Sequence, residues 1–557
     1  MADYTAALNE AFAKGVKGKN KGAVSAVIFD NEKILYSFYD GFIDKEKKLA
    51  PKDDSLFMIG SNTKVMTALG IFRLYEDGKL SLDDPITKFI PEFSVKSRIG
   101  EYTITIENLL MHRAGIQCDL YEYIVGTKHK YTDIIDGLKE TYMTSAPGTM
   151  FSYSNLGYTL LGIVLERASG KKYTDFLQEV LFAPLGMEVY FLRENELPSS
   201  VSERIARSYD KKGKHTLDTL GTMLPAGSNT YTRIGDLAKI GQLLMNDGRL
   251  GEVQLYKPET IQLMKTLKVM DELDNEMSVV GYGLIHHGMS LDYETGRILG
   301  HGGDTMYHHS SFDFLPDEKI GVIVFTNFLT GSGLSRKLAK DLFNTYLKEA
   351  GFPQKKKTSE KYVSFDPKDY VKTYDSILGP IRFKVDNKGQ LTTVLQKITF
   401  TLKKNEEGWL VASPKSLIGK LPPLSNSLKG LKFKQATYLG REILLLEQRG
   451  TSGAIGDLYR EPGVNSAWLK ALGTYKLVDK RFKGLFDKAV LKLQDGGVVV
   501  AVSEEGSTIN YYLDVVKETE ATVKGFGRNT NQTAFLRKVG DTYELSIDGI
   551  TSVRKAK

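Results

Sequence analysis

The sequence predicts an α+β protein with several domains, in which helices and strands share the first part of the chain and short strands fill the remainder. The chain of 557 residues is longer than a single hydrophobic core usually supports, so two or three domains are expected. Before residue 350 the apolar residues follow both the strand period and the helix period. After residue 360 they alternate over short runs separated by turns, which favours two small antiparallel β-barrels.

The composition indicates a globular protein without a concentrated charge. Hydrophobic residues make up 41% of the chain and aromatic residues 10%, as in soluble domains. The net charge of +7 comes from 75 basic and 68 acidic residues, which are spread along the chain. The densest basic run, Lys355 to Lys357, is interpreted as part of a solvated linker, because a nucleic-acid binder would gather its basic residues in a stripe. We therefore expect no nucleic-acid partner.

Cysteine content and hydropathy bear on the location of the protein. Cys118 is the single cysteine, which excludes an intramolecular disulfide. No run approaches the roughly 18 consecutive apolar residues of a membrane helix. Residues 1–20 are polar, have apolar residues at helical spacing and lack the apolar centre of a signal peptide. Taken as it stands, the chain is expected to be cytoplasmic, with no membrane partner.

The first elements after the N-terminal helix are a hairpin and a helix that begins at Ser61. Residues 22–29 and 33–38 are two apolar runs rich in β-branched and aromatic residues, joined by a polar turn. The sequence Ser61-Asn62-Thr63-Lys64 then opens a run with helical period up to Tyr75. Residues three apart on a helix share a face, so the lysine amine lies beside the serine hydroxyl.

This spacing suits nucleophilic catalysis. A serine hydroxyl is a weak nucleophile unless a base takes its proton, and an amine in a partly apolar site can lose its own proton and serve as that base. The helix start adds backbone N–H groups with partial positive charge. Ser61 is thus a candidate nucleophile and Lys64 a candidate base. The alternative is a serine that caps the helix and a solvated lysine, since this short motif occurs by chance in many chains.

A second group of polar residues precedes the next long helix. Residues 79–93 are expected to form a loop with one helical turn, and residues 106–115 a short helix ended by Gly115. A Pro-Gly turn and a polar loop then present Tyr153 and Asn155 before an apolar helix at 159–168. A phenol can act as acid or base beside a lysine, and an amide can hold both lysine and substrate. Alternatively, Tyr153 packs and Asn155 caps the helix.

A third motif lies before two predicted strands, at residues 310–315 and 320–325. Helices are expected at 173–181 and 233–246, and they are followed by His301-Gly302-Gly303-Asp304. The glycines let the backbone pass close to another group, and a strand edge there offers the Asp304 N–H to an oxyanion. His301 could instead be a structural histidine. The pairs His286-His287 and His308-His309 lack a matching carboxylate or cysteine spacing, so no metal site and no cofactor are expected.

These three motifs, in this order, resemble the serine β-lactamase and penicillin-binding-protein superfamily, and within it the class C-like branch that includes esterases and D-aminopeptidases. The resemblance covers roughly residues 5–350. It implies a β-lactamase-like catalytic domain, with an antiparallel sheet flanked by helices and a helical subdomain, and the site between them. Supporting segments are Leu109 to Gly115, Tyr158 to Gly162, Pro184 to Met187 and Pro225 to Gly227.

The resemblance also implies roles for the residues. Ser61 would attack and Lys64 would accept its proton, while Tyr153 would protonate the leaving group and help activate the deacylating water. Asn155 would orient substrate and lysine. The backbone N–H groups of Ser61 and Asp304 would form the oxyanion hole, with Gly303 beside them. Loss of one such donor costs on the order of 3 kcal/mol.

Position 301 departs from the usual pattern. Penicillin-binding proteins and β-lactamases usually carry a lysine there, whose charge suits a substrate carboxylate. His301 is neutral or only partly charged near pH 7, which weakens the case for β-lactamase or carboxypeptidase activity. Histidine followed by two glycines is similar to the D-aminopeptidase and esterase members.

The composition changes at the end of the predicted catalytic domain. Domains are expected at residues 1–353, 354–462 and 463–557, with the barrels at about 360–455 and 466–557. This arrangement resembles the D-aminopeptidases, in which a barrel loop restricts the active site to a free amino terminus. Residues 450–457 are one candidate for such a loop, with Asp457 able to pair with an ammonium group. A plain flexible linker is the alternative.

The expected function is therefore hydrolysis through an acyl-enzyme on Ser61. The first hypothesis is a D-stereospecific aminopeptidase or amidase acting on small peptides. The second is a carboxylesterase with the same machinery, and the third is a non-enzymatic penicillin-binding-like sensor. The expected partner is a small peptide or ester substrate, and a homo-oligomer is left open.

Overall fold

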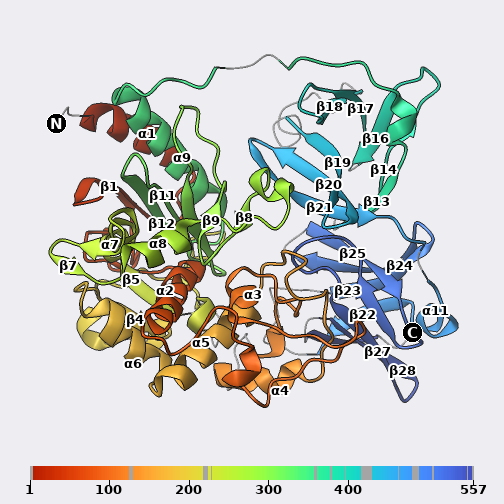
Figure 1. The fold of residues 1–557 in the computed structure, drawn as a ribbon, viewed down its shortest axis with the longest axis horizontal. Helices are drawn as coiled ribbons and strands as arrows, with labels where there is room; N and C mark the ends of the chain where they lie inside the picture. The colour runs from red at the N-terminus through yellow and green to blue at the C-terminus, as the bar shows by residue number, and fades with distance from the viewer. Residues whose placement is uncertain are drawn as a thin grey trace.

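The computed structural model (Figure 1) describes most of the chain. The described residues are 4–123, 129–217, 224–227, 229–356, 360–376, 379–395, 397–415, 430–461, 463–478, 488–504, 507–547 and 550–554. Residues 357–359 of the expected linker lie outside this part. Among the described residues, no helix has the length and apolar character that crossing a membrane requires.

A seven-stranded antiparallel sheet forms the centre of the first domain, in the order β2-β1-β12-β11-β10-β9-β8. The apolar run at the start of the hairpin becomes a buried central strand, which pairs with a strand some 300 residues later in the chain. This pairing places both ends of the domain in one sheet. The strands are β1 Ala23–Asp30, β2 Ile34–Gly41, β8 Val279–Val280, β9 Ile285–His286, β10 Leu299–Asp304, β11 His309–Leu315 and β12 Ile320–Thr326.

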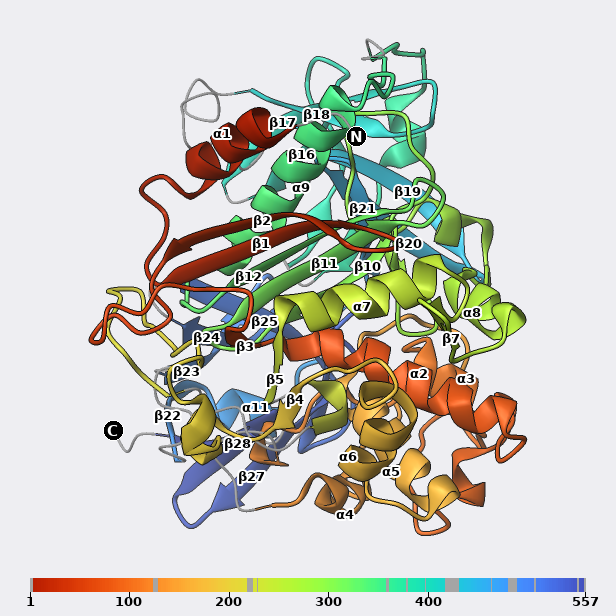
Figure 2. The ribbon, with the colours of Figure 1, turned by 90° about the vertical axis from the view of Figure 1, so that its left-hand side faces the viewer.

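Helices cover both faces of this sheet, as Figure 2 shows. On one face, α1 Thr5–Val16 and α9 Ser332–Glu349 pack together through a buried apolar cluster. On the other face, α7 Ile234–Met245 lies close to the sheet, because a Cβ at Gly241 would be only 2.6 Å from the Phe29 ring. The expected sheet flanked by helices is confirmed.

A helical subdomain packs beside the sheet. Its central helix, α2 Thr63–Glu76, is buried almost all round, as expected for a helix that is apolar on every side. The other helices are α3 Ile106–Leu110, α4 Ile134–Leu138, α5 Asn155–Ser169, α6 Tyr173–Leu177 and α8 Pro258–Lys265. The helix predicted to end at Gly115 instead ends at Leu110, since His112 adopts a left-handed backbone with φ of 54°.

Short elements complete the first domain. The small strands are β3 Leu56–Met58, β4 Val189–Phe191, β5 Thr230–Arg233, β6 Arg249–Leu250 and β7 Val253–Gln254. Turns of 3₁₀ helix include η1 Gly60–Asn62, η2 Ile86–Lys88, η3 Tyr121–Tyr123, η4 Tyr131–Asp133, η6 Glu194–Glu196, η7 Ser199–Val201, η8 Leu224–Ala226 and η9 Glu272–Asn275, and a π turn, η5 Gln178–Phe182, follows α6. Strand β5 pairs with β3, just before η1, and so steadies the chain entering that turn.

The first C-terminal unit is a nine-stranded antiparallel sheet in the order β14-β13-β21-β20-β19-β18-β17-β16-β15. Its strands are β13 Thr373–Ser376, β14 Ile381–Arg382, β15 Lys384–Val385, β16 Leu391–Leu395, β17 Ile398–Lys404, β18 Leu410–Pro414, β19 Lys432–Tyr438, β20 Arg441–Gln448 and β21 Thr451–Leu458, after the turn η10 Pro367–Tyr370. The segment predicted as a loop at 450–457 is therefore mostly strand β21, and that prediction is wrong.

The second C-terminal unit is a closed barrel of strands β22 to β29. A short helix, α11 Ser466–Lys470, places the fully buried Trp468 in its core. The strands are β22 Gly473–Leu477, β23 Lys488–Gln494, β24 Gly497–Glu504, β25 Ser507–Val515, β26 Glu520–Val523, β27 Thr533–Val539, β28 Thr542–Ile547 and β29 Ile550–Arg554. The expected C-terminal barrels are confirmed as one closed sheet and one larger sheet.

Both C-terminal units are anchored to the first domain by buried or partly buried polar contacts. The Tyr438 hydroxyl of the first unit donates to the Asp274 carboxylate at 2.8 Å and accepts from Arg113 at 2.7 Å. Arg113 also pairs with Asp274 at 2.9 Å, and both side chains are at most 3% exposed. Glu520 of the second barrel pairs with Arg98. Figure 1 shows both units along the same side of the first domain.

Candidate active site

Ser61 lies in the 3₁₀ turn η1, immediately before α2, rather than in the helix itself. The turn is fixed against strands β10 and β11. The Asn62 side chain donates to the Ser310 hydroxyl at 2.6 Å, and that hydroxyl donates to the Ile59 carbonyl at 2.9 Å. Gly60 has a φ of +54°, and a Cβ there would meet the Asp304 backbone nitrogen at 3.0 Å. The serine is therefore presented at the edge of the sheet.

Lys64 is fully buried and lies about one helical turn after Ser61 in the chain. Its Nζ donates to the Asn155 amide oxygen at 2.8 Å and to the Ala226 carbonyl at 2.5 Å, and it lies 3.1 Å from the Ser61 Oγ. Burial, and next the charge of Arg528, lower the pKa of this lysine well below its usual value. A neutral amine has two N–H donors, which the two carbonyl oxygens accept. In that form the lone pair is available to the serine hydroxyl, whose Oγ is 3.1 Å away.

Tyr153 contributes a phenol to the same point, since its hydroxyl hydrogen-bonds with Ser61. Burial raises the pKa of this phenol, so it keeps its proton. The Tyr153 ring stacks on His112 with ring centres 4.3 Å apart, and the His112 Nδ1 accepts the Ser154 N–H at 2.8 Å. Lys64 Nζ lies 4.9 Å from the Tyr153 ring centre. The phenol can thus donate a proton close to both serine and lysine.

Asn155 begins a chain of polar contacts that ends in the second barrel. Its amide donates to the Asp119 carboxylate at 2.7 Å, and the other Asp119 oxygen accepts from Arg528 at 2.7 Å. Arg528 lies between β26 and β27, in residues 524–532, which we call the barrel-tip segment. The Ser152 hydroxyl also donates to the Gly527 carbonyl of this segment at 3.3 Å. The helix cap is Ser154, not Asn155, so the Asn155 amide is left for the lysine.

His301 lies on β10, 3% exposed, with its ring centre 6.0 Å from that of Tyr153. Its Nδ1 is 2.6 Å from the Gly302 carbonyl, and its Nε2 is buried with no hydrogen-bond partner among the described residues. Burial, together with the charge of Lys64, lowers its pKa to about 3. The imidazole is therefore neutral near pH 7 and supplies no fixed charge to a substrate carboxylate.

Gly303 and Asp304 bring β10 against the serine turn. A Cβ at Gly303 would lie 1.9 Å from the Ile59 carbonyl oxygen, so only glycine fits. The Asp304 carboxylate accepts from His309 at 2.7 Å and from Arg336. Burial opposes its ionisation, but these two partners lower its pKa to about 2. The carboxylate is thus held by its own partners, while the backbone nitrogen lies beside the serine turn.

Replacing Gly303 with alanine is expected to lower kcat on the order of 10²-fold, because the added methyl group must push β10 away from the serine turn and its backbone donors. Steady-state kinetics on an activated ester measures the effect. Gly302→Ala is the matched control, since a Cβ at Gly302 meets nothing closer than the Ser310 carbonyl at 3.8 Å. Equal activity of the two variants would contradict the close approach as a functional requirement.

Asp457 does not join this group. It lies on β21, 5% exposed, where it pairs with Arg441 at 2.8 Å and with Arg460 at 3.3 Å. Its carboxylate therefore already faces two cations, which corrects the expectation that it awaits an ammonium group. The barrel contact with the site is made instead by Arg528, from the other barrel.

Three residues of the site were not singled out from the sequence. His112 lies in a segment that carries the family resemblance, but nothing local indicates that it stacks on Tyr153. Asp119 has no motif around it. Arg528 follows Gly525-Phe526-Gly527, and glycines between two predicted strands are the one signal that could have marked a projecting turn.

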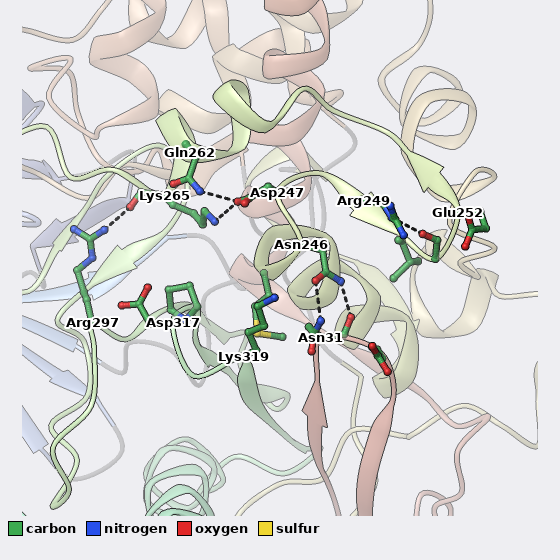
Figure 3. A pocket seen from close by; sticks show the side chains of 15 residues that line it. Asn31, Asn246, Asp247, Arg249, Glu252, Gln262, Lys265, Arg297, Asp317 and Lys319 are labelled. Carbon is green, nitrogen blue, oxygen red and sulfur yellow. Dashed lines mark hydrogen bonds and ion pairs between the residues drawn. The ribbon is translucent and has the colours of Figure 1, made fainter. Parts of the chain in front are cut away.

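A surface cavity of about 980 Å³ lies elsewhere on the first domain (Figure 3), and none of the candidate active-site residues lines it. It is bordered by the β1–β2 turn, the end of α7 and α8. Lys265 pairs with Asp247 at 2.6 Å, and Arg297 donates to the Lys265 carbonyl at 2.9 Å. Charges of both signs thus border this surface cavity, and among them Lys265 and Asp247 form an ion pair.

An antiparallel sheet covered by helices, with a serine and a buried lysine at its edge, defines a β-lactamase-like fold. The family model named Beta-lactamase matches residues 8–345, and the chain belongs to this family of serine β-lactamases and penicillin-binding-protein-like hydrolases. Protein flp of Staphylococcus aureus (strain MRSA252) is 29% identical over 199 residues, which are 35% of this chain and 39% of flp. Penicillin-binding protein 4 of Amycolatopsis lactamdurans is 27% identical over 344 residues, covering 59% of this chain and 85% of that protein.

Solved structures extend the similarity to the C-terminal sheets. The structure of SurE has a TM-score of 0.57 and 21% identity, covering 82% of this chain and 99% of SurE. The octameric penicillin-binding protein homologue from Pyrococcus abyssi has a TM-score of 0.50 and 20% identity, covering 99% of both chains. At these identities the likeness concerns the fold. The match covers only 39% of flp, so the activity and assembly of this protein do not follow from that relative.

Proposed function

We propose that this protein is a serine hydrolase that forms an acyl-enzyme on Ser61. The observation that carries the proposal is the position of the buried Lys64 amine, 3.1 Å from the Ser61 Oγ, with carbonyl acceptors for both of its N–H groups. This geometry leaves the lone pair directed at the hydroxyl, which is the requirement for a general base.

The proposed reaction uses the surrounding groups in turn. The Ser61 Oγ attacks the substrate carbonyl while its proton passes to the Lys64 amine. The developing oxyanion is stabilised by the backbone N–H groups of Ser61 and Asp304. Tyr153 gives its proton to the leaving group and regains one from Lys64, which leaves an acyl-serine. Water then attacks the acyl group, and the same residues return the protons to their starting positions.

The charges at the site bear on the substrate. Arg528 brings a guanidinium cation to the site, whereas Lys64 is neutral when it acts as the base, and the carboxylates of Asp119 and Asp304 are each paired with an arginine. The Arg528 side chain is 43% exposed. This balance supports an ester or amide whose acyl part carries a carboxylate more than one with a free ammonium group. A carboxylesterase or amidase of this kind is therefore the first candidate.

A D-stereospecific aminopeptidase acting on small peptides is the second candidate. It is favoured by the barrel-tip segment, because the Arg528 guanidinium from another domain lies over the Tyr153 ring, 5.3 Å from its centre, where it would restrict a long substrate. Paired substrates distinguish the two candidates. N-succinyl-D-alanine p-nitroanilide and D-alanine p-nitroanilide share a scissile bond and differ in charge, and p-nitrophenyl acetate and the L-isomers complete the panel.

We expect ester turnover and a higher kcat/KM for the succinyl substrate than for the free amine. A preference for D-alanine p-nitroanilide would instead establish the aminopeptidase. Mass spectrometry of quenched enzyme should show one added acyl group in the wild type and none in Ser61→Ala. Absence of an acyl-enzyme with every substrate, together with no turnover, would leave the non-enzymatic sensor.

Replacing Arg528 with glutamine is expected to move the acidic limb of the kcat/KM profile to higher pH. The charge of Arg528 lowers the pKa of Lys64, and that of Asp119 raises it. Loss of the arginine removes the charge that lowers the lysine pKa and leaves the Asp119 charge without its partner, so the lysine pKa rises for both reasons. At a pH on the acidic limb, below the lysine pKa, activity falls about tenfold for each unit by which that pKa rises, because the neutral fraction of the amine falls by that factor. The pH–rate profile measures this.

Arg537→Gln is the matched control for Arg528. It removes the same charge from the same barrel, at a side chain that is 76% exposed. The control profile is expected to coincide with that of the wild type. An unshifted profile for Arg528→Gln, or a shift to lower pH, would contradict the proposed electrostatic role.

A further inference from the structure

The closed second barrel contains a cavity of about 70 Å³. Its wall is mostly aliphatic and comes largely from six of the strands, β22 to β25, β28 and β29. The aliphatic lining residues are Leu477, Ala489, Val500, Val502, Leu545, Ile547 and Ile550. A water-sized group takes up roughly 10–15 Å³ by the same measure, so the space suits one small ring or a short branched chain.

The first domain closes one side of this cavity. Tyr121, from the turn η3, lines it together with the barrel strands. Leu477 and Ile550 also pack against the hydrophobic core of the first domain. The cavity therefore lies where barrel and first domain meet, and part of its wall, including Val500 and Leu545, belongs to the barrel core around Trp468.

One polar atom of the cavity wall lacks a partner. The amide oxygen of Asn529 is buried and has no hydrogen-bond partner among the residues that the structure describes. A buried acceptor without a partner costs free energy, unless a ligand supplies the missing donor. The backbone of Asn529 is left-handed, with a φ of 65°. This conformation sets the direction in which the side chain leaves the backbone.

The wall of this cavity is continuous in sequence with the wall of the Ser61 site. Tyr121 follows Asp119 by two positions, and Asn529 follows Arg528 directly. The backbone N–H of Asn529 hydrogen-bonds with the Cys118 sulfur. The same two short segments thus border the active site on one side and the barrel cavity on the other.

We propose that this cavity is a binding site for a small uncharged molecule that is apolar over most of its surface and carries one hydroxyl or N–H donor. The aliphatic wall would bury the apolar part, and the Asn529 amide oxygen would accept the hydrogen bond. A charged ligand is disfavoured, because the lining offers a single ionisable cation, Lys488, whose side chain lies at the solvent-exposed rim. The proposal does not depend on the reaction at Ser61.

Phenol and toluene test the proposal, since they are nearly equal in size and differ in one donor. Isothermal titration or ligand-observed NMR on the full chain is expected to show saturable binding of phenol at one site, with toluene several-fold weaker. Asn529→Gly keeps the left-handed backbone and should weaken phenol about five- to tenfold without affecting toluene. Ala489→Leu should weaken both by filling the cavity.

The outcomes separate clearly. Absence of saturable phenol binding would overturn the proposal, as would equal binding of the two compounds to the wild type. Phenol binding that neither variant changes would place the ligand elsewhere and would also overturn it. If Ala489→Leu fails to fold, as judged by circular dichroism, Asn529→Gly still decides the question, because it adds no volume to the barrel.

Discussion

Replacing Ser61 with alanine is expected to lower kcat by about 10⁴-fold or more on an activated ester, because no other hydroxyl lies at the point where Lys64 and Tyr153 converge in the described structure. The fold should be preserved, since the serine side chain is small and the turn is held by Asn62 and Ser310. The measurement is initial-rate kinetics, with thermal unfolding to confirm that the variant is folded.

Ser199→Ala provides the comparison for this variant. Ser199 is exposed in a 3₁₀ turn of the same domain, and its replacement should leave kcat unchanged. A Ser61→Ala protein that is as active as wild type would remove the acyl-enzyme from the mechanism, and with it both proposed enzymatic functions.

Replacing Lys64 with methionine is expected to lower kcat by about 10³-fold and to remove the acidic limb of the pH–rate profile. Methionine fills the space of the lysine stem and leaves no base beside Ser61. The wild-type rate should rise with pH as Lys64 loses its proton, because only the neutral amine accepts the serine proton. The variant should lack this rise.

Lys265→Met controls for the loss of a buried lysine as such. Lys265 is 7% exposed and pairs with Asp247 at the edge of the surface cavity shown in Figure 3, away from Ser61. Its replacement is expected to affect stability more than kcat. A Lys64→Met variant whose pH profile keeps the wild-type acidic limb would show that another group titrates in that range.

The elements that the sequence predicts well are those with strong local patterns. The β1–β2 hairpin, the buried helix after Ser61 and the strands after His301 all have the apolar period of their final structure, and the motifs on them meet in one site. The local sequence pattern is less informative where tertiary contacts determine the backbone conformation. The chain around Ser61 is a 3₁₀ turn because Gly60 must pass close to Asp304.

The wrong prediction of a barrel loop has a similar cause. Residues 450–457 contain glycines and small polar residues, which favour a turn, yet they pair with β20 over most of their length. Arg528 was overlooked because its partner Asp119 is 409 residues away, and no local rule links the two. The pairing depends on how the second barrel docks on the first domain, which neither segment encodes alone.

The distance in sequence between Asp119 and Arg528 has a consequence for biosynthesis. A ribosome releases the first domain long before it reaches the strands on either side of Arg528. Until then, Asp119 beside Asn155 lacks its arginine, and its unneutralised charge holds more of Lys64 in the protonated form. A nascent or truncated chain therefore has the nucleophile in place but a poorer base. On the proposed mechanism, the full rate therefore requires the second barrel to be docked on the first domain.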